Sequence, residues 1–325
     1  MTTLAGKWQK LPDNPIFDHS FKDVWDKYPS APHILRVGNK LRMYYYGERP
    51  GPRGKERRIG FAEASLDDPM NWIKSPSNPV LDLSKPGNPD SVWCAYPWVL
   101  PINDRLWYMY YAGFGDEWVK EDFKLNYTLL AISYDAGITW KRSGLGPLLP
   151  LGIPGSPHEH GSGSCSVLKV GEEYWMWYTA LRTNKNYPTR KNLYIGIALA
   201  TSKDGLNFTP HKAGLVIKPD FNNPIEDYIC SKPVVYYDNG KFKLWYNSAG
   251  SEYKVRYAES IDGINFKIDP KVVIDTSNEG WDSDMTEYVC TINEQERELL
   301  FYSGNNFSGI GVAKKIHPQN SQIVD

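Results

Sequence analysis

With 325 residues, 37 basic and 38 acidic side chains and a net charge of −1, the chain lacks the charge excess that would favour binding to nucleic acid or an acidic membrane. Segment 1–11 is polar, and no apolar run approaches the roughly 20 residues of a membrane span, so neither a secretion signal nor a transmembrane helix is expected. Four cysteines without a Cys-x-x-Cys spacing favour buried core thiols in a reduced, cytoplasmic protein.

Five copies of one short pattern run along the chain. In each copy an aromatic residue is followed seven positions later by a short apolar stretch, and these aromatic residues are Trp8, Trp72, Trp140, Phe208 and Phe266. Turn sequences precede three of them, at 135–137, 204–205 and 262–263, and their Asp-Gly or Asp-Ala-Gly residues supply the positive φ that hairpins need. Such repetition predicts an array of similar β-units.

An apolar strand and then an aromatic strand are expected upstream in each unit. The apolar strands are predicted at 33–35, 98–100, 166–168, 234–236 and 288–290. The aromatic strands are predicted at 42–46, 107–111, 174–178, 243–246 and 300–302. Aligning the apolar strands places Pro32, Pro97, Cys165, Pro233 and Glu287 at one position. We therefore predict an all-β chain built from radial sheets of four antiparallel strands.

The fifth unit ends near Ile316 without an outer strand, and the segment around Trp8 carries the missing pattern. Pairing this segment with the last unit would remove an open sheet edge. We predict one five-bladed β-propeller domain over residues 1–325, with its last blade closed by the N-terminal strand. The predicted blades span about 18–83, 84–151, 152–218, 219–275, and 276–316 together with 5–17.

In a propeller, the loop that leads into the innermost strand and the hairpin between the second and third strands open on the same face. The leading loops carry Asp26, Asp90, Glu159, Glu226, Asp227, Asp282 and Asp284. Carboxylates around one mouth suit general acid–base chemistry on a sugar, or the binding of a divalent metal such as Mg, Mn or Ca. The candidate catalytic carboxylates are Asp26, Asp90, Glu159, Asp227 and Asp284.

Two of only six histidines flank a carboxylate in the leading loop of the third unit, in the sequence His158-Glu159-His160. Alternate residues of an extended segment point the same way, so His158 and His160 could share a face. The pair is a candidate for acid–base catalysis or for metal binding, although no third ligand stands at a recognisable spacing. A polar loop with histidines bonded to backbone carbonyls is the alternative.

Two basic hairpins overhang the same face, and they contribute the candidate substrate-binding residues Arg53, Arg58, Arg182 and Arg190. Because arginine binds phosphate in a bidentate manner, they favour a phosphorylated or nucleotide-linked sugar, with solvated surface loops as the alternative. Aromatic side chains near the mouth, among them Trp93, Tyr96 and Tyr228, could stack on a sugar or base ring.

The predicted fold, and repeat units such as 195–208, resemble the five-bladed glycoside hydrolase superfamily, which includes families 43, 32 and 130. The resemblance implies an acidic base, a second Asp and a Glu acid on successive inner strands, with the second often in an Asp-Pro pair. Here the residues before the aligned position are Ala31, Tyr96, Ser164, Lys232 and Thr286, so the Asp-Pro pair is missing. Glu159 is the nearest counterpart of the acid, and Asp26 and Asp90 are candidates for base and modulator. Lys232 is a candidate partner for a substrate phosphate or carboxylate.

The sequence is compatible with three functions. The first is a glycosidase-like enzyme in which Glu159 protonates the leaving oxygen while Asp26 or Asp90 acts as base or nucleophile. The second is an intracellular sugar-nucleotide enzyme, a mutase or transferase, whose arginines hold the diphosphate. The third is a glycan-binding propeller without catalysis. All three imply a carbohydrate or nucleotide-sugar partner.

Overall fold

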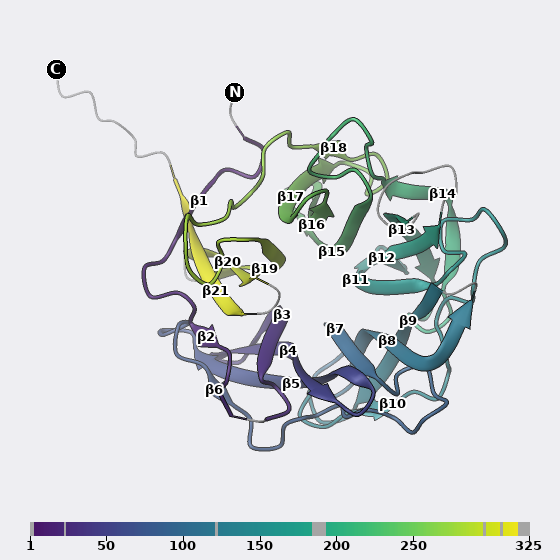
Figure 1. Ribbon diagram of the computed structural model, residues 1–325, viewed down its shortest axis with the longest axis horizontal. Helices are drawn as coiled ribbons and strands as arrows, with labels where there is room; N and C mark the ends of the chain where they lie inside the picture. Colours follow the sequence, from purple (N-terminus) through teal and green to yellow (C-terminus); the bar gives the residue numbers. More distant parts are fainter. Residues whose placement is uncertain are drawn as a thin grey trace.

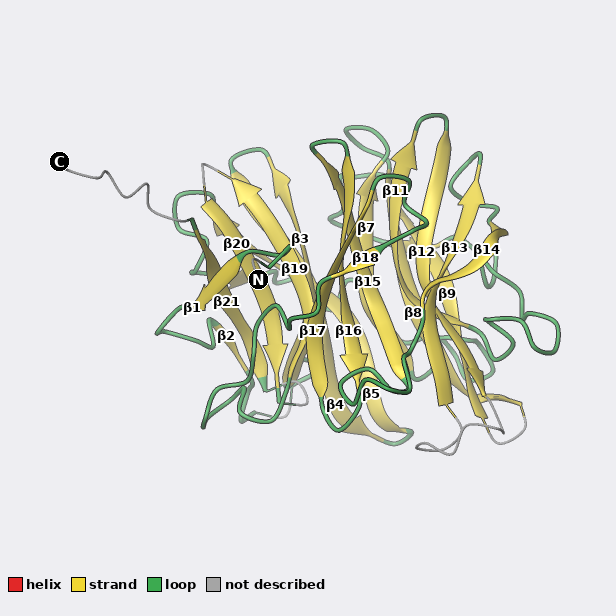
Figure 2. Cartoon of the chain, turned by 90° about the horizontal axis from the view of Figure 1, so that it is seen from above, coloured by secondary structure: helices red, strands yellow, loops and turns green. Residues whose placement is uncertain are grey.

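The computed structural model describes residues 3–22, 24–120, 123–183, 193–294, 297–305 and 308–317, without the side chains of 117–120 and 123–124. Strands, turns and loops make up this part of the chain, and no helix occurs in it (Figure 2). No helix among the described residues is therefore long and apolar enough to cross a membrane. The prediction of an all-β chain is confirmed.

The strands form five antiparallel units with the same order of strands. The first strands are β3 (Tyr28–Val37), β7 (Trp93–Pro101), β11 (Ser162–Val170), β15 (Ile229–Asp238) and β19 (Thr286–Glu294). The second strands are β4 (Lys40–Gly51), β8 (Trp107–Lys120), β12 (Glu173–Thr183), β16 (Lys241–Ala249) and β20 (Arg297–Gly304). The third strands are β5 (Gly54–Ser65), β9 (Phe123–Ser133), β13 (Leu193–Ser202), β17 (Tyr253–Ser260) and β21 (Gly309–Ile316).

The outer strands of units 1 to 4 follow in sequence as β6 (Ile73–Lys74), β10 (Lys141–Arg142), β14 (Thr209–Ile217) and β18 (Lys267–Ile268). Neighbouring units are joined by single parallel pairs. Arg57 pairs with Trp93 between units 1 and 2, and Ile195 pairs with Ile229 between units 3 and 4. Figure 1 shows the units arranged around a common centre, with the first strands nearest to it. The loops that lead into these strands therefore converge.

The N-terminal segment supplies the outer strand of unit 5. Strand β1 (Lys7–Lys10) pairs antiparallel with β21, and β2 (Phe17–Asp18) pairs with the start of the same strand. The side-chain amide of Asn14 exchanges two hydrogen bonds with the backbone of Val312, at 2.8 and 2.9 Å. In unit 1, Asn78 does the same with Phe61, at 3.0 and 2.8 Å. The two segments thus occupy equivalent places in their units.

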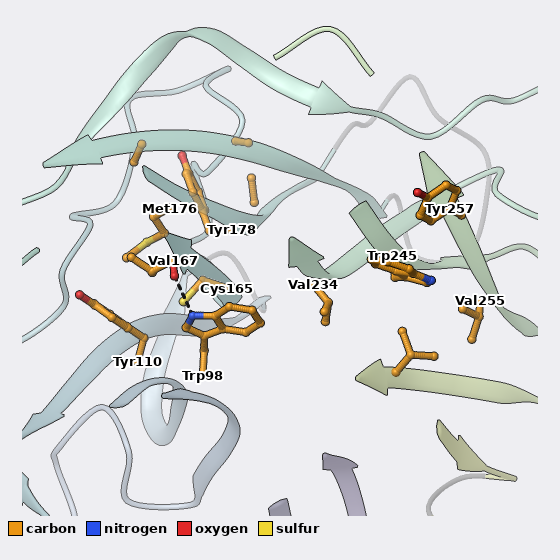
Figure 3. Close-up of a cluster of buried hydrophobic side chains, with 14 of the residues drawn as sticks. Trp98, Tyr110, Cys165, Val167, Met176, Tyr178, Val234, Trp245, Val255 and Tyr257 are labelled. Atoms are coloured by element: carbon orange, nitrogen blue, oxygen red, sulfur yellow. Dashed lines mark hydrogen bonds between the residues drawn. The ribbon is translucent and has the colours of Figure 1, made fainter. Parts of the chain in front are cut away.

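Aromatic residues of the first and second strands fill the space between neighbouring units. Figure 3 shows this packing around Trp98, whose indole nitrogen donates to the carbonyl oxygen of Val167 at 2.9 Å. Met176 and Tyr178 of unit 3 are buried beside them. Bonds of this kind fix one unit against the next, which holds the central strands in place. All four cysteines are free and buried.

Every first strand is interrupted by a β-bulge at the same place. The pairing register shifts between Ser30 and His33 in unit 1, and the corresponding shift recurs in each of the other four units. Four residues at this place have a left-handed backbone: Ala31 (φ 54°), Tyr96 (φ 54°), Lys232 (φ 50°) and Tyr288 (φ 52°). This conformation is rare for residues other than glycine, and bulges of this kind redirect side chains.

Side chains from the preceding unit satisfy the N–H groups of the bulged residues. The N–H of Ala31 donates to Ser303 Oγ at 3.1 Å, which links unit 1 to unit 5. The N–H of Lys232 donates to Thr179 Oγ1 at 3.0 Å, and that of Tyr288 to Asn247 Oδ1 at 2.9 Å. The left-handed residues are therefore held by contacts that recur between neighbouring units.

The bulges also correct the alignment of the first strands made from the sequence. The register places Ser164 and Val289, rather than Cys165 and Glu287, beside the three prolines Pro32, Pro97 and Pro233. Units 3 and 5 have no proline at this place, so their sequences carry no local marker of the bulge. The residues before the aligned position are Ala31, Tyr96, Gly163, Lys232 and Tyr288, and none of them is aspartate.

Candidate functional site

A cavity of about 310 Å³ lies where the bulges of units 2 to 5 meet. Three of the four left-handed residues, Tyr96, Lys232 and Tyr288, line it. Its other polar lining comes from Asn126, Ser164, Thr179, Ser231 and Tyr253, and Trp93 adds an aromatic wall. Among the described residues, no carboxylate belongs to this lining.

A larger groove of about 760 Å³ lies against the outer strand β6 of unit 1. Its cations are already paired, because Glu63 accepts from both Arg42 and Lys40, at 2.7 and 3.0 Å, and Lys74 is paired with Asp26 at 2.6 Å. The central cavity is therefore the better candidate for a site, since it collects strained residues and a cation.

Among the described residues, Lys232 is the only positively charged side chain in the lining of the central cavity, and it is 3% exposed. No hydrogen bond or ion pair to its Nζ atom occurs among the described residues, although its backbone is fixed by Thr179. Burial lowers the pKa of Lys232 to about 8, because a desolvated ammonium group is disfavoured. Burial, and then the charge of Lys232, lower the pKa of His33 to about 3. His33 is therefore neutral near pH 7, and Lys232 provides the local charge.

A cluster of aromatic hydroxyl groups occupies another side of the cavity. Arg57 stacks on Trp93, with its Cζ atom 4.0 Å from the ring centre, and its Nη1 atom donates to the Tyr96 hydroxyl at 3.1 Å. The Tyr96 hydroxyl donates to that of Tyr288 at 3.3 Å. Arg57 is itself held by Glu48 at 2.8 Å. Sequence reasoning did not identify Arg57, Tyr288 or Tyr253 as site residues.

Glu287, which lies beside Tyr288 on β19, is 1% exposed. Burial raises the pKa of Tyr288 well above its ordinary value, and the neighbouring Tyr96 and Glu287 raise it further. Burial, and then the charges of Tyr96 and Glu287, have the same effect on Tyr253. These two hydroxyl groups therefore stay protonated and can donate hydrogen bonds at neutral pH.

Asp26 and Asp90 do not line the cavity, because each takes part in a contact that recurs in all five units. A tyrosine of the second strand donates to a side chain of its own leading loop: Tyr45 to Asp26, Tyr111 to Asp90, Tyr246 to Glu226 and Tyr302 to Asp282. In unit 3, Tyr178 bonds to His158 Nδ1 at 3.2 Å. A fivefold contact of this kind fits a structural role in anchoring the leading loops.

Basic side chains complete four of these anchors. Their partners are Lys74 for Asp26, Arg142 for Asp90, Arg256 for Glu226 and Lys10 for Asp282, at 2.6 to 3.1 Å. The carboxylates are buried as well, since Asp26, Asp90 and Asp282 are each at most 3% exposed. Their charges are thus compensated within the scaffold.

The segment His158-Glu159-His160 forms a turn, in which the N–H of Gly161 bonds back to the carbonyl of His158 at 3.0 Å. The expectation that the two histidines share a face of an extended segment was therefore wrong, because a turn does not alternate its side chains. Glu159 is half-buried, and its Oε2 atom accepts from the N–H of Gly155 at 2.8 Å. Burial lowers the pKa of His158. None of the three residues lines the cavity, and the described residues hold no group of three potential metal ligands.

The remaining acidic and aromatic candidates also lie outside the cavity lining. Asp227 is half-buried, and Asp284 is exposed and accepts from the hydroxyl of Ser283 at 3.2 Å. Tyr228 is 8% exposed and packs in an apolar cluster with Leu181 and Ile195. Leu181 and Ile195 themselves line the cavity, so Tyr228 packs behind its wall rather than in it.

Two of the predicted arginines are already engaged. Arg58 bonds to Asp82 at 2.6 Å and to Glu56 at 3.0 Å, and Arg182 donates to the carbonyl of Gly155 at 3.1 Å. Arg53 is half-buried in the turn between β4 and β5, and Arg190 lies outside the described residues. Of the predicted substrate-binding residues, Trp93, Tyr96 and Lys232 line the cavity, and their roles stay predictions.

No family model matches the chain. An uncharacterised protein of Mycobacterium tuberculosis is 27% identical over 315 residues, which cover 94% of this chain and 98% of the relative. A glycosyl hydrolase from Bacteroides ovatus has a similar structure, with a TM-score of 0.71 and 17% identity over 95% of this chain and 93% of that one.

Two further solved structures extend the similarity to particular glycoside hydrolase families. One belongs to a study of glycoside hydrolases in family 130 that target β-1,2 mannosidic linkages, with a TM-score of 0.70, 17% identity, and 95% and 93% of the two chains covered. The other is a family 32 β-fructofuranosidase of Bombyx mori, with a TM-score of 0.64, 14% identity, and 95% and 61% covered. The chain therefore has the fold of the β-propeller glycoside hydrolase superfamily, as the sequence resemblance predicted.

Proposed function

We propose that this protein is a carbohydrate-active, glycosidase-like enzyme built as one five-bladed β-propeller, in which β1 closes the fifth blade. The five units of equivalent strand order and the pairing of β1 with β21 support this architecture. The bond from Ala31 to Ser303 supports contact between the first and last units. The likeness to solved glycosidases supports a carbohydrate as the substrate.

The proposed sugar site is the central cavity, and one observation carries this assignment. Tyr96, Lys232 and Tyr288 all adopt a left-handed backbone and line the same cavity. Such a conformation costs on the order of 1–3 kcal/mol for each residue and persists where the surrounding structure imposes it, often at functional sites. Trp93 and the tyrosines provide the aromatic faces and hydroxyl donors that bind sugar rings.

We assign the acid–base step to carboxylates close to this cavity. Glu287 is the first candidate, because its charge acts on Tyr253 and Tyr288, which both line the cavity. Glu159 is the second, since it precedes β11 by three residues and matches the acid implied by the family resemblance. Asp26 and Asp90 are less suitable as base, because their charges are neutralised by Lys74 and Arg142.

A panel of aryl glycosides, assayed for hydrolysis and for phosphorolysis, tests this proposal. Glu287→Gln is expected to lower kcat by about 10²–10⁴-fold if it is the acid or base, while Glu159→Gln tests the second candidate. Glu172→Gln, at an exposed position in the turn before β12, is the matched control and should leave kcat unchanged. Turnover that survives both the Glu287 and the Glu159 substitution would overturn the acid–base assignment.

The sugar-nucleotide enzyme remains the alternative, favoured by the cation of Lys232, whose Nζ atom no described residue bonds. It predicts thermal stabilisation by nucleoside diphosphates that is lost in Arg53→Ala. The glycan-binding propeller predicts sugar binding without turnover, unchanged by either glutamate substitution. A divalent metal and a cytoplasmic location stay predictions, and a metal requirement would show as turnover that a chelator removes.

A further inference from the structure

The central cavity has an uncompensated charge. Lys232 is 3% exposed, and no hydrogen bond or ion pair among the described residues reaches its Nζ atom. Buried charges in proteins are normally paired, because an ion that leaves water without a partner costs several kcal/mol. The buried cations elsewhere follow this rule, since Arg57 is paired with Glu48, and Arg256 with Glu226.

The groups that face Lys232 from the other first strands do not neutralise it. They are His33 of β3, Cys165 of β11 and Cys290 of β19, at equivalent positions just after the bulges. Burial raises the pKa of both thiols, and His33 is neutral near pH 7. The lining of the cavity offers no carboxylate within the part of the chain that the structure describes. The position opposite Lys232 is thus left for a ligand.

The other polar groups of the cavity suit the same kind of ligand. Tyr253 and Tyr288 carry hydroxyl groups that stay protonated, so they can donate hydrogen bonds. Tyr96 receives its hydrogen bond from Arg57 and lies next to Tyr288. A cation surrounded by hydroxyl donors forms charge-assisted bonds with a carboxylate or phosphate oxygen. A neutral sugar hydroxyl would leave the charge of Lys232 unbalanced.

We propose that the substrate carries an anionic group, a carboxylate or a phosphate ester on the sugar, and that Lys232 binds this group. The inference rests on the proposed function, because it names the substrate class of the same cavity. Neutral glycans are then poor ligands of the cavity, and an acidic or phosphorylated sugar fills it. Tyr253 and Tyr288 orient the bound oxygens.

Calorimetric titration of the full chain tests this without any need for turnover. The probes are D-glucuronate, D-glucose 1-phosphate, inorganic phosphate and D-glucose, each measured with the wild type, Lys232→Met and Lys232→Arg. We expect at least one anionic sugar to bind the wild type about 10–100-fold more tightly than D-glucose, as charge-assisted hydrogen bonds of this type provide. Lys232→Met should remove this preference, and Lys232→Arg should retain part of it.

Lys267→Met, at an exposed position of β18, is the matched control and should bind as the wild type does. The glucuronate and glucose 1-phosphate arms distinguish a carboxylate from a phosphate ester, and the inorganic phosphate arm shows whether the sugar contributes. Equal binding of all four probes, or an anion preference that persists in Lys232→Met, would overturn the proposal. Lys232-dependent anion binding without turnover would instead support the subsite and contradict the glycosidase.

Discussion

The Nζ atom of Lys10 lies 2.6 Å from the Oδ2 atom of Asp282, although 272 residues separate the two in sequence. Lys10 ends the N-terminal strand β1, and Asp282 lies in the leading loop of unit 5. The same Oδ2 atom accepts the hydroxyl of Tyr302 at 2.8 Å. One carboxylate therefore ties the start of the chain to its last unit.

Deletion of residues 1–10 should destabilise the whole domain, because it removes the pairing of β1 with β21 and leaves Asp282 buried without its cation. We expect the free energy of unfolding in urea to fall by about 3–5 kcal/mol, the usual loss when a buried charge loses its partner. Lys7→Ala, at an exposed position on the same strand, should change it by less than about 0.5 kcal/mol. A truncated protein with unchanged stability would contradict the closure.

The tyrosine anchors should contribute stability rather than catalysis. Tyr302→Phe removes one hydrogen bond to a buried carboxylate, so the free energy of unfolding should fall by about 1–3 kcal/mol. Tyr237→Phe, where the tyrosine is 60% exposed, provides the control with little expected change. Chemical denaturation measures both. If Tyr302→Phe proves as stable as this control, the anchoring role is disproved.

His33 should make the fold sensitive to mild acid. Its folded pKa is about 3 against an ordinary value of 6.5, so the unfolded chain binds the proton more strongly and stability is lost as the pH falls below about 6.5. Between pH 7 and pH 5 this loss amounts to about 2 kcal/mol. His33→Gln should remove that part of the pH dependence, which denaturation curves at the two pH values would show. An unchanged pH dependence would mean that His33 is protonated in the folded state.

Lys232 should cost stability at neutral pH in the absence of a ligand. The pKa of Lys232 is about 8 in the folded protein, against an ordinary value of 10.5. The unfolded chain therefore binds the proton more strongly, and the free energy of unfolding falls as the pH drops from 10.5 through 8. The cost at pH 7 is about 3 kcal/mol. Lys232→Met should therefore be more stable than the wild type at pH 7, with the gain shrinking toward pH 10.5. A variant less stable at pH 7 would indicate that the ammonium group has a compensating partner.

The sequence allowed the strand order of the units to be predicted, because turn residues and aromatic strands recur at regular distances. The anchors could also have been found, since the acidic residues Asp26, Glu226 and Asp282 each precede a tyrosine by 19 or 20 residues. Such regularity indicates a scaffold, because a catalytic residue would differ between units. Naming Asp26 as a catalytic candidate did not take this regularity into account.

The cavity could be predicted only in part. Trp93, Tyr96 and Lys232 follow from their place near the strand starts, whereas Tyr288 depends on the bulge of unit 5, where no proline marks the position. The contact between Tyr96 and Tyr288 joins residues 192 apart in sequence, and no local pattern encodes it. Pairings of this kind depend on the arrangement of the whole ring of strands.

The pairing of β1 with β21 also constrains how the protein is made. Strand β1 is synthesised well before its partner β21 (Gly309–Ile316), because all the other units lie between them in the sequence. Domains generally fold as units during synthesis, and unpaired strand edges are prone to aggregation until their partners form. Four units can therefore assemble while the chain is still growing, but β1 stays unpaired until β21 has been made.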